Sequence, residues 1–540
     1  MRIGKYVGLV VVLLFVWLTR PFYHGLAMFF YIYSPIFVPV IVLTAMAAHY
    51  GYKKGKIREW SDPIEEAATY GFMTGIITLF IFALTVGMIG NAATYTYIYH
   101  HNDYIAVDSL PQMNNETVRA VPMLVAKSLM NKYFVEARYF PDGAQISEVN
   151  GSLMWVGQLT PDGFINHYRL KPKGVIMVPM DDMKVSTVTA TMKCGKNIGI
   201  TDNIKWILEK HKYWVNYHEP IPVIEDGIVY YIVPFTAYKF RFYHVVPYWG
   251  GVAVVNTETC EVKYLSPEEA TKKYSNLPIF PESLAWTYAE AMNYYKDSVI
   301  GNWWNVIAKH VNQIELHRYD IGGNGQPFFI KLRDGRGAWF IAAEPYGTGS
   351  GIKRIMVITM NGTVYYKDFK TPITGVNAAI SAIKNALPRF DWSQFDIVEP
   401  IPVEVQGQLY WRFVVVPGGA STIRMIALVP MIDRAVQPSD IKFFESIEEY
   451  KAFILGKNYH RPVTQPGEGN ETIMGVVKGI WTYNLNGTTH FLVKVSSNNT
   501  VLIDVPVSCL STEEIAEMFS INEGQNVTFT WNDECYVPSD

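Results

Sequence analysis

The 540-residue chain lacks the short signatures of the common enzyme classes. It has no HExxH zinc pair, no GxSxG serine elbow, no phosphate-binding P-loop and no CxxC redox pair. Charged residues are scarce, at 18% against a usual share of about 25%. The formal net charge is −3 without a long run of either sign, so the basic footprint of a nucleic-acid-binding protein is missing. The sequence therefore predicts no catalytic, cofactor-binding or metal-binding residues and no nucleic-acid partner.

Long apolar segments are present, and all of them lie before residue 93. The first, about residues 6–20, predicts a short span with Arg20 reaching out to the interface. A cleaved signal peptide is the alternative, although bulky residues stand where a signal peptidase requires small ones. The second and third, about residues 25–48 and 70–93, are each long enough to cross about 30 Å of hydrocarbon. Residues 1–102 are thus predicted to be a transmembrane anchor of three helices.

The basic residues between the second and third segments predict the orientation of the anchor. Lys53, Lys54, Lys56 and Arg58 crowd this loop, and positively charged loops stay in the cytoplasm. The N-terminus is then cytoplasmic, and the region after about residue 103 lies on the outer side of a cell membrane or viral envelope. An outer aromatic belt at the lipid surface is expected at Tyr95, Tyr97 and Tyr99.

Glycosylation sequons and cysteines agree with an outer location, because none lies before residue 93. Seven Asn-x-Ser/Thr sequons occur, at Asn115, Asn150, Asn361, Asn470, Asn486, Asn498 and Asn526. The four cysteines are Cys194, Cys260, Cys509 and Cys535. They are either buried thiols or two disulfides. If disulfides form, Cys194–Cys260 and Cys509–Cys535 are the natural pairs among three connectivities, because each pair stays within one proposed unit.

An internal repeat with a period of 180 residues organises the outer region. The sequence Glu-Pro-Ile-Pro-Val at residues 219–223 recurs at 399–403, and an N-terminal helix signature at 266–269 recurs at 446–449. The order of predicted helices and strands around these motifs is also shared. The sequence predicts two duplicated α+β modules, 103–277 and 278–457, because solenoid repeats are far shorter.

The C-terminal segment, residues 471–535, predicts five or so short strands and one helix that begins at Ser511. In element order alone it resembles an OB-fold, a small β-barrel that binds oligonucleotides or sugars or serves as a structural module. A basic stripe for nucleic acid is absent. The predicted fold class is therefore membrane-anchored α+β, with three transmembrane helices, two duplicated modules and a small barrel.

Residues 245–274 contain a strand, a turn with Asn256-Thr257-Glu258-Thr259, a second strand and a helix start. This pattern resembles the closing hairpin of PepSY-like domains. Cys260 stands where the family pattern prefers Gly, and residues 425–444 of the second repeat have lost the pattern. The resemblance implies a non-catalytic extracytoplasmic module, which in some relatives restrains peptidases, and it carries over no catalytic residue.

Two further features bear on binding. His211 and His218, like His310 and His317, are seven residues apart, which on a helix is about 10.5 Å and too far for one metal ion. They are interpreted as surface or packing residues. Residues 230–249 form the densest aromatic stretch; one face of its strands must be core, and the remainder is the best local candidate for partner contact.

These features predict a non-enzymatic surface or envelope membrane protein that mediates assembly or recognition. Its expected partners are the lipid bilayer and other extracytoplasmic or membrane proteins, with self-association included. Two alternatives remain open: a membrane-tethered regulator of an extracytoplasmic peptidase, and an unrecognised cell-surface hydrolase. Co-purification with a protease would favour the regulator. Clustered carboxylates with raised pKa values in one concave pocket would favour the hydrolase.

Overall fold

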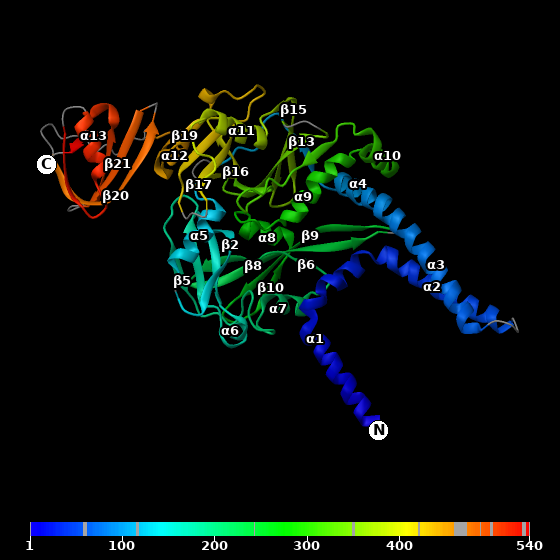
Figure 1. The fold of residues 1–540 in the computed structure, drawn as a ribbon. Helices are drawn as coiled ribbons and strands as arrows, with labels where there is room; N and C mark the ends of the chain where they lie inside the picture. Colours follow the sequence, from blue (N-terminus) through cyan, green and yellow to red (C-terminus); the bar gives the residue numbers. More distant parts are fainter. Residues whose placement is uncertain are drawn as a thin grey trace. The chain divides into compact units, whose positions relative to one another are not determined.

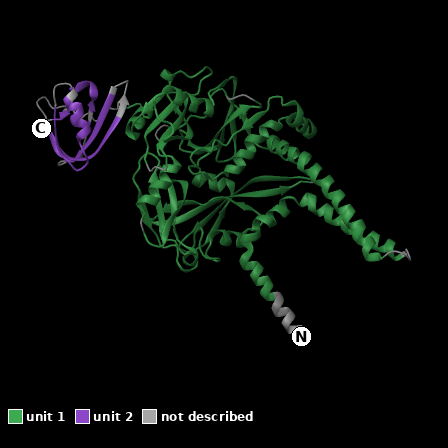
Figure 2. Cartoon of the chain, viewed as in Figure 1, with its two compact units in different colours: residues 1–457 green, residues 458–540 purple. Residues whose placement is uncertain are grey.

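The computed structural model describes residues 2–57, 62–114, 118–134, 136–241, 243–347, 351–418, 422–457, 472–485, 488–496, 500–531 and 536–538 (Figure 1). The chain is a mixed α+β protein with long N-terminal helices. It divides into two compact units, Met1–Lys457 and Asn458–Asp540 (Figure 2).

Three N-terminal helices are long and apolar enough to cross a membrane, as predicted. They are α1 (Arg2–Ile32), α2 (Ser34–Ile57) and α3 (Pro63–Leu84), and α3 continues through a π-helical turn, η1 (Thr85–Gly90), into α4 (Asn91–His101). The boundary between the first two helices differs from the prediction. Helix α1 runs through Pro21 and ends at Ile32 instead of about residue 20, and Figure 1 shows that the helix is bent. Pro35 instead opens α2, where its missing amide is tolerated.

Helices α2 and α3 run side by side in opposite directions, and small residues let them approach closely (Figure 1). A Cβ placed on Gly51 would lie 2.6 Å from the carbonyl oxygen of Glu66. A Cβ on Gly75 would lie 3.1 Å from the hydroxyl of Thr44. The pair is therefore a tight antiparallel hairpin, which closes at the end that carries Lys53.

Residues 103–457 form the body of the protein, and its first half contains two antiparallel sheets joined by a helix. One sheet has the order β2-β3-β4-β5, and the other has the order β10-β9-β8-β6, with β7 also on β8. The strands are β2 (Tyr139–Val149), β3 (Ser152–Pro161), β4 (Gly174–Pro179), β5 (Ser186–Thr189), β6 (Asn216–Tyr217), β7 (Ile221–Glu225), β8 (Ile228–Phe240), β9 (Val245–Asn256) and β10 (Val262–Leu265). The helices are α5 (Met123–Tyr133), α6 (Phe164–Arg169), α7 (Ile204–His211) and α8 (Pro267–Tyr274).

The second half also contains two sheets. One sheet has the order β1-β15-β14-β13-β11, with β12 on β13, and the other has the order β16-β17-β18-β19. The strands are β1 (Tyr104–Ala106), β11 (Ile314–Leu316), β12 (Phe328–Lys331), β13 (Gly337–Pro345), β14 (Ile352–Thr359), β15 (Val364–Ile373), β16 (Phe395–Val405), β17 (Gln408–Pro417), β18 (Met425–Pro430) and β19 (Lys442–Phe444). The helices are α9 (Glu282–Ala291), η2 (Met292–Tyr294), α10 (Val299–Trp304), η3 (Asn305–Lys309), α11 (Val376–Ala386), η4 (Pro438–Asp440) and α12 (Ile447–Ile454).

The two halves share one hydrophobic core, although each has its own similar order of helices and strands. Trp155 on β3 donates its indole N–H to the Val121 carbonyl at 2.9 Å, and Trp339 on β13 donates to the Phe280 carbonyl at 2.8 Å. Both tryptophans belong to a single buried cluster. In addition, β1 from the start of the first half pairs in parallel with β15 of the second half. Residues 103–277 and 278–457 are consequently parts of one compact unit.

The helical region at residues 282–309 is interrupted. Helix α9 ends at Ala291, and α10 begins only after Ser298, whose side chain accepts a hydrogen bond from the Gly301 amide. The buried Asn302 side chain donates to the carbonyls of Tyr294 and Lys296, which holds the intervening turn against α10. This turn directs α10 toward α4 and η1, which it contacts.

The C-terminal unit has the predicted strands and helix. These are β20 (Thr472–Leu485), β21 (Thr488–Ser496), β22 (Thr500–Pro506), η5 (Val507–Cys509), α13 (Thr512–Ser520), β23 (Asn526–Trp531) and β24 (Tyr536–Pro538). Ser511 caps α13 with a complete capping box. The predicted closed barrel is not found in the described residues: the sheet order β22-β21-β20-β23-β24 leaves β22 and the three-residue β24 as unpaired edges.

Candidate functional site

The most unusual buried group in the body consists of Arg119, Glu399 and Arg412. Glu399 lies on β16 and Arg412 on the neighbouring β17, while Arg119 comes from the segment before α5. Arg412 donates from Nη2 to Glu399 Oε2 at 3.0 Å, and Arg119 Nη2 lies 3.7 Å from Glu399 Oε1. Asn324 also donates to Glu399 Oε1, at 2.6 Å. All three charged residues are buried, so this is an ion cluster that joins the two halves.

The local backbone turns Glu399 inward. Strand β16 contains a bulge between Val398 and Ile401, where the register with β17 shifts. Glu399 has a φ of 54°, in the left-handed region that non-glycine residues rarely adopt. A bulge of this kind re-aims a side chain. The backbone strain, of order 1 kcal/mol, is offset by the hydrogen bonds that the carboxylate gains from Arg412 and Asn324.

The charges of the cluster do not balance. Among the described residues, Glu399 is the only carboxylate that pairs with either guanidinium group. Arg412 Nε and Nη1 are buried and have no described hydrogen-bond partner. Burial lowers the pKa of Arg119 to about 10, although the nearby Glu399 carboxylate opposes that shift. The cluster therefore has one excess positive charge and unused hydrogen-bond donors.

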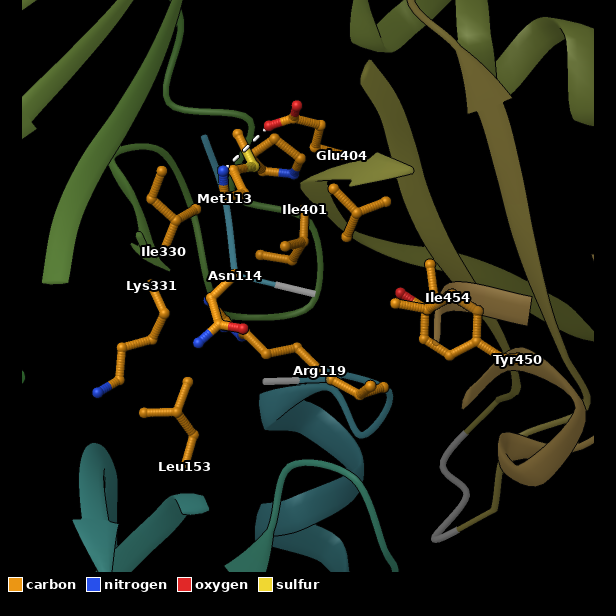
Figure 3. A pocket seen from close by; sticks show the side chains of 13 residues that line it. Met113, Asn114, Arg119, Leu153, Ile330, Lys331, Ile401, Glu404, Tyr450 and Ile454 are labelled. Atoms are coloured by element: carbon orange, nitrogen blue, oxygen red, sulfur yellow. Dashed lines mark hydrogen bonds between the residues drawn. The ribbon is translucent and has the colours of Figure 1, made fainter. Parts of the chain in front are cut away.

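A small cavity of about 40 Å³ adjoins this cluster (Figure 3). Figure 3 shows the side chains of Asn114, Arg119, Lys331 and Tyr450 around it. Burial raises the pKa of Tyr450 to about 12, so its hydroxyl stays protonated. A cavity of this size holds a water molecule or two or one small anion, and it is too small for an organic substrate. The polar side chains beside the cavity, Arg119 among them, belong to the buried contact between the two halves.

A second, larger cleft of about 630 Å³ lies where helix α1 packs against α7. Glu209 of α7 is buried there, with Oε1 3.6 Å from His24 Nδ1 and 4.0 Å from Lys205 Nζ. Neither carboxylate oxygen accepts a hydrogen bond from a described residue. Burial raises the pKa of Glu209 to about 7, although Lys205 and Arg20 oppose the shift. This carboxyl group can therefore bind or release a proton near neutral pH.

The opposite wall of this cleft carries His218 and the ion pair of Lys196 with Glu219. His218 Nε2 lies 2.8 Å from the Thr236 hydroxyl, and burial lowers the pKa of His218 to about 4. Lys196 donates to Glu219 at 2.6 Å. The cleft thus combines a neutral histidine with one carboxyl group of raised pKa. The hydrolase hypothesis calls for several such carboxylates, and the described residues of this cleft supply only Glu209.

Three of the four cysteines are described, and all three are free thiols. Cys194 and Cys260 lie near each other, because their sulfur atoms are 3.7 Å and 4.0 Å from the same Thr257 carbonyl oxygen. Burial raises the pKa of the Cys194 thiol, so it is a poor nucleophile. The predicted disulfide between them is not formed in this structure. The other predicted pair is Cys509–Cys535, and Cys535 lies outside the described residues.

Cys260 has a φ of 64°, the left-handed conformation that glycine adopts without strain. This explains why a pattern like that of PepSY domains prefers glycine there. The segment does form a strand, a turn, a second strand and a helix, namely β9, β10 and α8. The resemblance itself remains a prediction.

Of the seven predicted glycosylation sites, three are described: Asn150, Asn361 and Asn526. All three are exposed at turns or at a strand end, where a glycan would be accommodated. The other four, Asn115, Asn470, Asn486 and Asn498, lie outside the described residues. Glycosylation stays a prediction.

The aromatic stretch at residues 230–249 divides between core and surface. Tyr231, Phe235 and Trp249 are buried, whereas Phe240 and Tyr248 are exposed near the tip of the β8–β9 hairpin. The tyrosines expected to form an aromatic belt at the lipid surface pack against the body instead. The Tyr95 hydroxyl donates to Glu290 at 2.6 Å and its ring stacks on Tyr294, so Tyr95 faces the body. The side chains of Tyr97 and Tyr99 also pack against the core of the body.

The histidine pairs do not act together. His218 binds Thr236, and His310 stacks on Tyr346 with ring centroids 3.9 Å apart. Within the described part of the chain, no three His, Cys, Asp or Glu side chains gather as metal ligands.

The ion cluster and the α1–α7 contact were not predicted, yet the sequence carries a signal for both. Glu399 and Arg412 interrupt apolar runs in strands, as Arg20 and His24 interrupt apolar helix sequence. A charge inside such a run is costly unless it is paired. No protein-family model matches this chain, and no curated protein matches it.

Proposed function

We propose that this chain is a non-enzymatic membrane protein whose β-rich body mediates assembly or recognition on the outer side of a cell membrane or viral envelope. The observation that carries the proposal is an exposed apolar patch on the body. The patch comprises Phe164, Ile165, Tyr168 and Ile200.

Helix α6 presents most of this patch. This short helix lies in the connection between β3 and β4. Its Phe164 and Ile165 side chains are 78% and 64% exposed. Phe164 packs edge-on against Tyr168 with ring centroids 5.2 Å apart, and the Gly199 amide donates to the His167 carbonyl at 2.6 Å, which brings Ile200 near. Contiguous exposed apolar side chains on a soluble surface mark sites of protein–protein contact.

The attachment of the body to its anchor supports a presenting role. Thr96 of α4 accepts a hydrogen bond from buried Asn302 at 2.9 Å, and Tyr95 binds Glu290. Helix α4 continues without interruption from α3, so the body is fixed to the membrane helix instead of tethered by a flexible linker. A duplicated body held in this way offers its surfaces in a constant orientation.

The partner is expected to be another extracytoplasmic or membrane protein, and a photo-crosslinking amino acid at Phe164 tests this in native membranes. Tyr133, which is 64% exposed on α5, is the matched control position. The proposal expects a defined crosslinked product from position 164 that is absent from position 133 and is lost in an Ile165→Ser variant. Equal products from both positions would overturn it.

The identity of the crosslinked product separates the alternatives. A peptidase would favour the regulatory role, and a second copy of the chain would favour self-association. The outward orientation is tested separately: protease added to right-side-out vesicles should digest the body and leave the basic segment 53–58 intact. Protection of the body would reject the orientation without deciding whether the α6 patch binds a protein.

A further inference from the structure

The α2–α3 hairpin fixes the level of the outer membrane surface. Gly75 of α3 packs against Thr44 of α2. Because the helices are antiparallel, Ser34, ten residues before Thr44, lies opposite Thr85, ten residues after Gly75. From Ser34 to Lys53 the helix rises about 28 Å at roughly 1.5 Å per residue, close to the hydrocarbon thickness of about 30 Å. The lipid tails therefore end near Ser34 and Thr85.

The second half of α1 lies beyond this level and along the body. Arg20, His24 and Met28 are buried on one face, and His24 Nε2 contacts the Tyr213 carbonyl at 2.8 Å. This face packs on α7, whose Lys205 and other polar residues belong in water. The opposite face is apolar and exposed, and Phe22 is 80% exposed. Its members recur at helical spacing: Phe22, Leu26, Phe29, Phe30 and Tyr33.

The tip of the β8–β9 hairpin lies between the two places where the chain enters and leaves the membrane. Tyr31, at the end of α1, packs on Phe240 and stacks on Trp214, each at 4.8 Å. Thr94, just after η1, donates to the Val245 carbonyl at 3.2 Å. The exposed aromatic side chains of this region are Trp214, Phe240, Tyr243 and Tyr248.

Helix α10 supplies a third apolar segment at the same level. It contacts both η1 and α4, and Asn302 fixes it to Thr96. Ile300 is 65% exposed, and Trp304 and Ile307 are also exposed. These side chains, from α10 and the adjoining η3, lie beside the segment that follows α3.

We propose that the exposed faces of α1, the hairpin tip and α10 form one apolar rim that sits in the outer leaflet, at the boundary between phospholipid headgroups and acyl chains. The rim is continuous with the membrane-spanning helices, and its Trp, Tyr and Phe side chains suit that boundary. It takes the role that the sequence suggested for Tyr95, Tyr97 and Tyr99. In this arrangement α1 does not cross the bilayer as one straight span: its second half lies on the surface.

Depth-dependent fluorescence quenching of the full chain in lipid nanodiscs tests the rim, independently of the α6 patch. A fluorescent amino acid is placed, one position at a time, at Phe22 and Ile300, with Ile76 in the middle of α3 as the deep control and Tyr133 as the aqueous control. The lipids carry bromine either near the headgroup or in the middle of the acyl chain. Because interfacial apolar faces lie about 5–10 Å into the headgroup region, shallow bromine should lower emission at Phe22 and Ile300 at least about twofold.

Emission from position 76 should be lowered most by mid-chain bromine. Emission from position 133 should be lowered by neither brominated lipid. Stronger quenching of Phe22 by mid-chain than by shallow bromine would mean that α1 is a continuous span through Ile32, and the α1 part of the rim would be wrong. Emission at Ile300 that matches the behaviour of Tyr133 would place α10 in water. Either result would show that the three apolar segments do not form one rim in the outer leaflet.

Discussion

Two stretches of the chain carry the same five residues, Glu-Pro-Ile-Pro-Val, and place their glutamates in opposite surroundings. The Glu219 side chain is 66% exposed and pairs with Lys196 across the surface cleft. The Glu399 side chain is 0% exposed and pairs with Arg412 in the core. Identical local sequence therefore gives a solvent-facing ion pair in one half and a buried ion cluster in the other.

The difference arises from what the two strands meet. Strand β7 begins at Ile221, so Glu219 precedes it. Strand β16 begins at Phe395, so Glu399 lies inside a strand, at a bulge that turns it toward Arg119 of the other half. At the position equivalent to Arg412, 180 residues earlier, the first half has Ile232, which is apolar and needs no partner. A repeated motif thus fixes the backbone path more firmly than the role of its side chains.

The largest expected effect is the loss of the buried carboxylate. Glu399→Gln removes the only described carboxylate partner of two buried guanidinium groups, and breaking a buried pair costs about 3–5 kcal/mol. Glu219→Gln is the matched control, with an expected cost of at most about 1 kcal/mol because surface pairs contribute little. Thermal unfolding of the full chain in detergent, followed by circular dichroism, measures both.

A second substitution sharpens this comparison. Adding Arg412→Met to Glu399→Gln removes one of the stranded charges, so it should recover part of the lost stability. Equal losses from Glu399→Gln and Glu219→Gln, or no recovery in the double variant, would show that the cluster does not hold the two halves together.

The next effect depends on pH and concerns Glu209, a buried glutamate without hydrogen bonds from described residues. Its pKa is raised to about 7, so between about pH 4.5 and 7 the folded state binds more protons than the unfolded chain. The resulting stability is fully present below about pH 4.5 and is lost as the pH rises through 7. Since one pKa unit corresponds to about 1.4 kcal/mol, the loss is at most about 3 kcal/mol.

Glu209→Gln tests this effect because it keeps the shape and removes the charge. The variant should be more stable than the parent chain at pH 8 and close to it at pH 4.5, in unfolding measured at both values. A variant that destabilises equally at both pH values would mean that the Glu209 carboxylate is well paired with His24 and Lys205, like Glu399 with its arginines.

Local rules predicted much of the fold, and contacts between distant segments account for what they missed. The starts of α8, α12 and α13 follow from serine caps, and the three apolar helices follow from composition. The α1–α2 boundary was misplaced, because the first span was expected to end at about Arg20, whereas packing of Arg20 and His24 on α7 carries the helix through Pro21. The pairing of Arg119 with Glu399 was not predictable from either local sequence, because it depends on how the two halves fold together.

The smallest effect compares the two repeated helix starts. In α8, Ser266 accepts a hydrogen bond from the Glu269 amide, and the Glu269 carboxylate accepts one from the Ser266 amide at 2.8 Å, which completes a capping box. In α12, Ser446 accepts from the Glu449 amide at 3.1 Å, but the Glu449 carboxylate binds the Glu445 amide instead. Replacement of either serine by alanine should cost about 0.5–2 kcal/mol.

Ser266→Ala should be the more harmful of the two, by a few tenths of a kcal/mol, because it also removes the hydrogen bond that the Ser266 hydroxyl donates to Glu269 at 2.9 Å. The companion variants Glu269→Ala and Glu449→Ala isolate the second half of each box. Glu269→Ala removes the bond to the N-cap amide of α8, whereas Glu449→Ala removes a bond to the Glu445 amide, one residue before the N-cap and outside the helix. The melting temperatures of the two first-repeat variants should therefore fall further than those of the two second-repeat variants. Equal shifts at all four positions would mean that solvent satisfies both helix ends, and the complete box of the first repeat would confer no advantage over the partial box of the second.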